Sequence, residues 1–137
     1  MKKKDLTNIQ VSGTKKKAIA RATITRGTGT VRINSRLIST YGTELTRMRL
    51  MEPLILAGES AKNYDINIKV IGGGAVSQAE AARLSIAKGL VKMTGDGDLK
   101  KKYIAYDKHL LVADSRQTEP QKPCRSSARR AKQTSKR

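Results

Sequence analysis

The last sixteen residues of the chain, 122–137, limit the fold most strongly because they cannot enter a hydrophobic core. Seven of them are Lys or Arg, none is Asp or Glu, and none is Val, Ile, Leu, Met or aromatic. Burial of such a segment cannot offset the conformational entropy that is lost when it is ordered. The sequence therefore predicts a folded domain within residues 1–113 and an extended basic tail over residues 114–137.

A tail of this composition takes up a defined shape only against a dense array of anions, such as the phosphates of folded RNA or DNA. The alternative is a solvated tail without a function. The rest of the chain favours the first interpretation, because residues 1–113 contain 21 basic and 9 acidic residues and the whole chain has a net charge of +18. Self-repulsion at this charge disfavours a compact state unless a nucleic acid or an anionic membrane surface neutralises it.

Several classes of site and location are disfavoured by the composition. No wholly apolar run is longer than that of residues 54–57, which is far shorter than the ~20 residues that span a bilayer. The N-terminal lysines precede no apolar stretch, so no secretory signal is expected. A single cysteine, Cys124, excludes an intrachain disulfide and a cysteine-based zinc cluster. We therefore expect a cytoplasmic protein with no membrane partner, no metal and no cofactor.

Catalysis and base stacking are also poorly supported. His109 is the only histidine, and no Ser–His–Asp order or pair of carboxylates stands out. The chain has four Tyr but no Trp or Phe. Single-strand binders stack bases on exposed aromatic rings, so we expect recognition of phosphates and of overall RNA shape instead.

Alternation of apolar and polar residues predicts four strands, at residues 9–11, 18–25, 31–33 and 63–71. A glycine turn at 27–29 predicts that the second and third strands form a hairpin. On the fourth strand, Asp65, Asn67 and Lys69 are expected to face outward.

Helical patterns occupy the remainder of the folded domain. The first begins at Thr43, with Leu45, Met48 and Met51 at spacings of three, and is expected to break at Pro53 and to end by Gly58. The next has Ser77 and Glu80 in a capping-box arrangement, Val76 at the start of its buried stripe, and Gly95 as its C-cap. Its basic surface is formed by Arg83, Lys88 and Lys92. A weaker pattern covers residues 99–112, and the order of elements predicts an α+β fold with helices on one side of a sheet.

Two segments are candidate phosphate contacts. Residues 72–74 are three glycines between a strand and a helix, a geometry that presents backbone N–H groups to an anion. They could serve a nucleotide-binding kinase, contact an RNA phosphate, or form only a tight turn, and the lysine of the Walker pattern is absent. Asp96 and Asp98 fit a turn better than a magnesium site. The run at residues 15–17 is either a solvated surface or an RNA contact, and the charge of the chain favours contact.

Three separated segments resemble the family of the ninth protein of the small ribosomal subunit. They are residues 13–21, residues 72–88 with their glycine loop, and residues 128–137 with their closing Ser-Lys-Arg. The match covers most of the chain in the right order, and residues 48–59 and 77–83 look archaeal rather than bacterial.

The resemblance implies a four-stranded sheet with helices on one side and a left-handed βαβ crossover, against the usual right-handed rule. Small-molecule kinases share this superfamily, but the family members are not enzymes. The resemblance also implies binding to rRNA of the head (3′ major) domain, with neighbouring ribosomal proteins as partners. The tail would extend to the peptidyl-site tRNA, where Lys136 and Arg137 would contact the anticodon stem.

The candidate sites follow from both lines of reasoning. No catalytic, metal-binding or cofactor-binding residue is predicted, and the alternatives to a ribosomal role are a kinase and a free basic RNA chaperone. The expected tRNA-binding residues are Lys136 and Arg137. The expected rRNA-binding residues are Lys15, Lys16, Lys17, Arg21, Arg26, Arg32, Gly73, Gly74, Lys122, Arg125, Arg129, Arg130 and Lys132.

Overall fold

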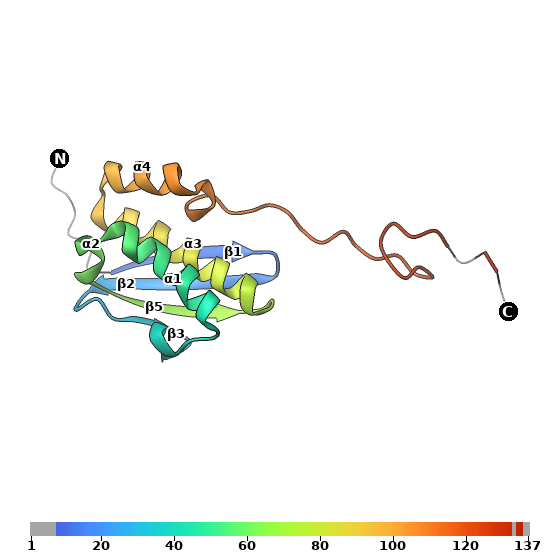
Figure 1. Ribbon diagram of the computed structural model, residues 1–137, viewed down its shortest axis with the longest axis horizontal. Coiled ribbons are helices and arrows are strands. Elements are labelled where there is room, and N and C mark those ends of the chain that lie inside the picture. Colours follow the sequence, from blue (N-terminus) through green and yellow to red (C-terminus); the bar gives the residue numbers. More distant parts are fainter. Residues whose placement is uncertain (1–7, 133, 136–137) are drawn as a thin grey trace.

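The computed structural model describes residues 8–132, 134 and 135, and shows helices stacked over one face of a single mixed sheet (Figure 1). The strands are β1 (Asn8–Lys15), β2 (Ala18–Arg26), β3 (Val31–Ile33), β4 (Arg36–Leu37) and β5 (Tyr64–Ile71). Their order across the sheet is β1-β2-β5-β3-β4. The α+β class is therefore confirmed, but the sheet has five strands rather than the expected four.

The predicted hairpin between the second and third strands is wrong. β2 pairs antiparallel with β1 on one side and with β5 on the other, and β3 pairs parallel with β5. The hairpin is instead β1–β2, closed by Lys16 and Lys17, and Lys16 adopts a positive φ of 53°. The prediction assumed that strands adjacent in sequence pair with each other. Instead β5, the strand with the strongest alternation, lies in the sheet between β2 and β3.

The helices are α1 (Glu44–Ala57), α2 (Glu59–Lys62), α3 (Ala75–Thr94) and α4 (Gly97–Tyr106), with 3-10 turns η1 (Ile38–Thr40) and η2 (Lys108–Leu110). The expected break at Pro53 does not occur, since α1 continues through it to Ala57. Pro53 is fully buried, and its carbonyl oxygen accepts a 2.7 Å hydrogen bond from the Tyr103 hydroxyl. Tertiary packing thus holds a helix that local propensity would interrupt.

The structure also corrects the expected N-cap and buried stripe of α3, the expected buried side of α1, and the expected end of the last helix. α3 begins after Gly74 with no side-chain cap, so Ser77 is not its N-cap, and Val76 is 56 % exposed. α1 buries Thr46, Leu50 and Pro53, while Leu45 and Met48 are exposed. The last helix ends at Tyr106, because Asp107 is extended and its side chain accepts a hydrogen bond from the His109 N–H. The C-cap at Gly95, with φ of 63°, is confirmed.

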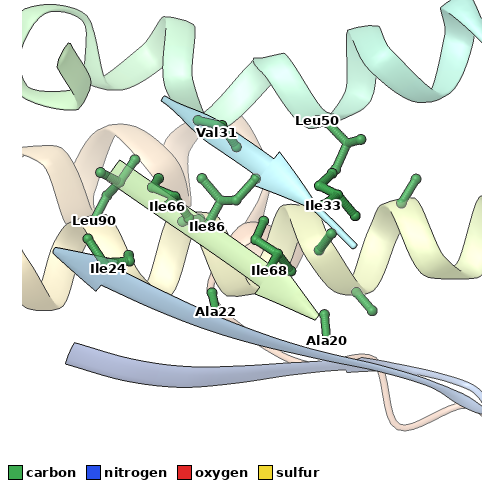
Figure 2. Packing of buried hydrophobic residues seen from close by; sticks show 14 of the residues in the cluster. Ala20, Ala22, Ile24, Val31, Ile33, Leu50, Ile66, Ile68, Ile86 and Leu90 are labelled. Atoms are coloured by element: carbon green, nitrogen blue, oxygen red, sulfur yellow. The ribbon is translucent and has the colours of Figure 1, made fainter. Parts of the chain in front are cut away.

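The core lies between the sheet and the helices (Figure 2). β2 contributes Ala20, Ala22 and Ile24, and the alternate residues of β2 point to the other face of the sheet. Small side chains on β2 let α3 approach closely, and Ile86 and Leu90 of α3 are fully buried against them. One face of the sheet is therefore covered, and the other is left open.

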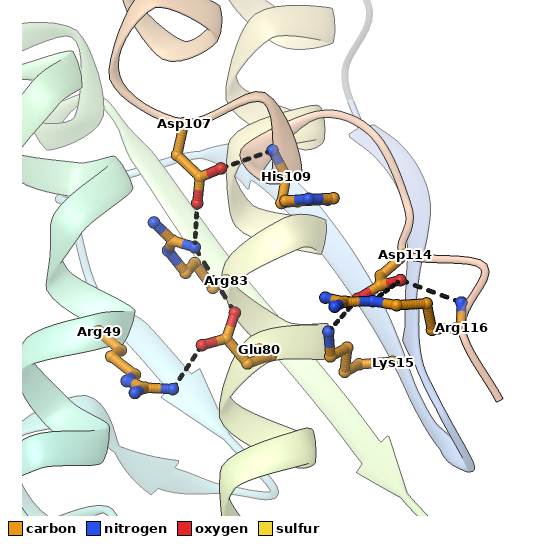
Figure 3. Close-up of polar contacts among 8 residues, drawn as sticks. All are labelled: Lys15, Arg49, Glu80, Arg83, Asp107, His109, Asp114 and Arg116. Atoms are coloured by element: carbon orange, nitrogen blue, oxygen red, sulfur yellow. Dashed lines mark hydrogen bonds and ion pairs between the residues drawn. The ribbon is translucent and has the colours of Figure 1, made fainter. Parts of the chain in front are cut away.

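A buried arginine links three helical segments above the sheet (Figure 3). The Arg83 side chain is 9 % exposed and forms ion pairs with Asp107 (3.0 Å) and Glu80 (3.5 Å). A third partner, Glu52 of α1, lies 2.5 Å from Nη2 of Arg83, outside hydrogen-bond angles. Glu80 also accepts a 2.7 Å hydrogen bond from Arg49. Burial alone would lower the pKa of Arg83, but the bond to Asp107 and the three carboxylates raise it. Arg83 was expected to be an exposed basic residue of α3, but it is buried and joins α3 to α1 and to the segment after α4.

Beyond η2 the described part of the chain contains no further helix or strand, and residues 115–132 extend away from the helices and sheet (Figure 1). One isolated parallel bridge, between Lys15 and Asp114, joins the start of this segment to the end of β1.

Candidate nucleic-acid interface

The open face of the sheet carries a polar, basic surface built by strand alternation. The register places Ser12, Arg21 and Lys69 in one row across β1, β2 and β5. The next row is formed by Gln10, Thr23, Asn67 and Arg32 from four strands. These seven side chains line a shallow hollow together with Asn34 and Ser35. No carboxylate of the described residues lines it, so that part of the chain offers cations, amides and hydroxyls to a ligand.

Two like charges stand directly opposite each other in this hollow. Arg21 and Lys69 are register partners on adjacent strands, and both side chains are exposed. No ion pair with either is found within the part of the chain that the structure describes. Opposed like charges at ~5 Å destabilise a sheet. An anion bound between them would remove that cost, and a backbone phosphate has the required charge.

Among the described residues, Asp65 of β5 is the carboxylate on the open face, and it binds the loop between β2 and β3. Asp65 accepts 2.9 Å hydrogen bonds from the Thr30 and Thr28 N–H groups, and these bonds lower its pKa. The Asp65 carboxylate is therefore held by hydrogen bonds to the loop of residues 27–30.

The predicted arginines are divided between two faces. Arg21 and Arg32 share the open face, whereas Arg26 follows the phase of the buried residues of β2 and lies on the opposite side at the strand end. Lys69 and Asn67 belong to the surface but were not among the predicted site residues. Their outward position on β5 was predictable from alternation, and their neighbours across the sheet were not.

The basic β1–β2 turn is only partly available to a ligand. Lys16 and Lys17 are exposed at its tip. The amino group of Lys15 instead forms a 2.5 Å ion pair with Asp114 (Figure 3). Two of the three predicted lysines therefore present free surface in the isolated protein.

The glycine loop at residues 72–74 both forms a tight turn and offers backbone N–H groups to a ligand. Gly72 and Gly73 have φ of 75° and 67° and pack against the β1–β2 turn, so that a Cβ on Gly73 would lie 3.0 Å from the Cβ of Ala18. Gly74 has φ of −101° and open space around it. It caps α3 by its backbone only, which leaves first-turn N–H groups of a 20-residue helix directed outward. The first two glycines are required by the turn because of their positive φ, and all three residues are exposed.

Substitution of these glycines is expected to separate the two uses. Gly73→Val should lower the melting temperature of the free protein by several degrees, on the order of 1–2 kcal/mol of backbone strain, because valine disfavours the left-handed region. Gly74→Ala should leave it nearly unchanged, since no atom lies within 4 Å of the added Cβ. Thermal melts of both variants without RNA provide the measurement. Equal melting temperatures would show that Gly73 is not held by the turn.

The described tail cations are exposed. Arg129 donates to Glu119 at 2.8 Å, and Arg130 donates to Ser126 at 2.9 Å. Lys122, Arg125 and Lys132 are also exposed. The predicted tRNA contacts, Lys136 and Arg137, lie outside the described residues.

No helix within the described ranges has the length and apolar character needed to cross a membrane. No cluster of three His, Cys, Asp or Glu side chains suited to a metal ion occurs in those ranges.

Comparison with known proteins agrees with the resemblance noted in the sequence. The profile of the family described as ribosomal protein S9/S16 matches residues 13–137. The small ribosomal subunit protein uS9 of Methanococcus maripaludis strain S2 is 47% identical over 119 residues, which cover 87% of this chain and 89% of that protein. The uS9 of Methanococcus vannielii is 44% identical over the same shares. The chain therefore belongs to the ribosomal protein S9/S16 family.

Proposed function

We propose that this protein is a structural constituent of the small ribosomal subunit and binds rRNA through the open face of its sheet and through its basic tail. The observation that carries the proposal is the pair Arg21 and Lys69, which no described carboxylate neutralises and which lies among amide and hydroxyl groups in the hollow. Such a surface suits sugar–phosphate backbone, which fixes position without reading base sequence. The names of the relatives support the same assembly.

The protein is not an enzyme, because its family consists of structural ribosomal proteins. The kinase alternative also lacks the lysine of the Walker pattern after the glycine loop.

Finer features rest on the family resemblance and on the composition of the tail. We place the partner rRNA in the head (3′ major) domain, with neighbouring ribosomal proteins of the head around it, in the cytoplasm. The connection from β3 to β5 through α1 joins parallel neighbours, and we expect it to be left-handed. Residues 1–113 and 114–137 would act as globular domain and tail.

The tail is proposed to reach the peptidyl-site tRNA. Lys136 and Arg137 would donate charge-assisted hydrogen bonds to phosphates of the anticodon stem, so that every tRNA species is held alike. Equal affinity of several tRNAs for subunits reconstituted with and without these two residues would contradict this role.

Neutralising the opposed pair tests the rRNA proposal. Arg21→Gln combined with Lys69→Gln should reduce the negative slope of log affinity against log salt by about 1.5 and weaken binding to small-subunit rRNA roughly tenfold near physiological salt. Filter binding across a salt series is the measurement. The melting temperature should not fall, because the two charges repel each other in the free protein.

The control removes the same charge from the helical side of the molecule. Lys100→Gln with Lys102→Gln changes two exposed cations of α4. Equal losses of rRNA affinity in the two double variants would show that the net charge of the protein, and not the open face of the sheet, determines affinity. Sedimentation of the protein apart from small subunits in a high-salt gradient would favour the chaperone alternative.

A further inference from the structure

One carboxylate lies where the tail leaves the folded domain, and two cations hold it. The Asp114 side chain is 7 % exposed and pairs with Lys15 at the end of β1 and with Arg116 two residues along the chain (Figure 3). Arg116 donates from Nε at 3.0 Å, from Nη2 at 2.7 Å and from its backbone N–H at 3.0 Å. These bonds, that of Arg116 before that of Lys15, lower the pKa of Asp114.

Backbone geometry reinforces the same attachment. Lys15 and Asp114 form a parallel bridge, so the first tail residue continues along β1 although 99 positions separate the two residues. Residues 116–118 then line a hollow with Lys15 and Lys16. The tail therefore begins its course beside the exposed lysines of the β1–β2 turn.

We propose that Lys15, Asp114 and Arg116 form a clamp that fixes the direction in which the tail leaves the domain before RNA is bound. Without the carboxylate, Lys15 and Arg116 would repel each other, and only the single backbone bridge to Lys15 would hold the start of the tail beside β1. With the Asp114 carboxylate, residues 114–118 are ordered before RNA binds. The entropic cost of ordering them therefore does not weaken RNA binding. Lys15 and Asp114 are thus positioning residues, and the turn and tail present one continuous basic surface.

For Asp114→Asn, the clamp predicts a change in RNA affinity opposite in sign to the change predicted from net charge alone. On a chain of net charge +18 that binds a polyanion, Asp114→Asn adds one positive unit and Lys15→Gln removes one. Net charge alone predicts tighter binding for the first variant and weaker binding for the second. The clamp predicts weaker binding for both. Its effect on RNA rests on the proposed rRNA binding, whereas its effect on the free protein does not.

The experiment compares four single variants of the full chain. Backbone ¹⁵N order parameters of Gln117 and Thr118 are measured in the free protein, and affinity is measured for a transcript of the small-subunit rRNA. Asp114→Asn and Lys15→Gln should lower both order parameters below ~0.6, the flexible range. Both should weaken RNA binding by roughly tenfold, the scale of one charge-assisted hydrogen bond.

Glu59→Gln and Lys62→Gln are the controls. They make the same two charge changes in an exposed pair on α2, where the side chains are 87 % and 70 % exposed. Their tail order parameters should equal those of the parent chain, and their affinities should shift in opposite directions. The amide spectrum of the β-sheet residues verifies folding of every variant.

Two results would overturn the proposal. Unchanged order parameters in Asp114→Asn would show that no clamp exists. Affinity of Asp114→Asn equal to or above that of Glu59→Gln would show that the clamp does not serve RNA binding. Failure of the parent chain to bind the transcript, with order parameters changing as expected, overturns the proposed function and leaves the ordering of the tail established.

Discussion

Deletion of residues 122–137 is expected to cause the largest loss of rRNA affinity of any single change to this chain. The segment contains seven Lys and Arg and no acidic residue. If most of them neutralise phosphates, the slope of log affinity against log salt should flatten by up to about 5, at ~0.7–0.9 per contact. Titration of the full and shortened chains with small-subunit rRNA at several salt concentrations gives both slopes.

A two-residue deletion separates the roles of the tail. Removal of Lys136 and Arg137 alone should leave rRNA binding and subunit formation nearly normal, while tRNA binding at the peptidyl site weakens by ~1.5–3 kcal/mol per lost charge-assisted bond at most.

For the deletion of residues 122–137, a slope of log affinity against log salt identical to that of the full chain would mean that the tail stays solvated when the domain binds RNA.

Arg83→Leu is expected to cause the largest loss of stability. Arg83 is 9 % exposed on its side chain and faces Glu52, Glu80 and Asp107. Leucine leaves these carboxylates without their shared partner, and removal of one member of a buried ion pair costs ~3–5 kcal/mol. For a domain of this size the melting temperature should fall by more than about 10 °C. Thermal melts monitored by circular dichroism provide the measurement.

The matched control lies on the same helix. Lys92→Leu makes the same chemical change at an exposed position of α3 and should shift the melting temperature by no more than about 2 °C, as surface substitutions usually do. A comparable shift in both variants would show that the arginine contributes no more than a solvated cation.

The position of Arg83 could not be predicted from its helix. Periodicity placed it with Lys88 and Lys92, because charged side chains ordinarily define the solvent face. Its partners come from α1, α3 and the segment after α4, and Glu52 lies 31 positions away in the sequence. The contacts depend on how these segments pack together, which no window of α3 contains.

Local patterns determined many individual elements. Alternation predicted strands at residues 18–25 and 63–71, with the correct outward face for the second, and Gly58 and Gly95 marked two helix ends. The charge excess and the lack of large apolar residues after position 121 predicted a polyanion partner and a segment outside the core. These features follow from the chemistry of neighbouring residues, so a sequence is sufficient to find them.

Tertiary structure alone decided how those elements meet. The insertion of β5 between β2 and β3 brings Lys69 opposite Arg21, and this creates the charge pair on the open face. α1 continues past Pro53, whose carbonyl oxygen accepts a hydrogen bond from Tyr103 of α4, and an ion pair over 99 positions joins Asp114 to Lys15. Each contact joins residues whose separation in sequence carries no signal of their proximity. The sequence alone therefore indicated a polyanion as partner, and the fold decided which cations lie together on the open face.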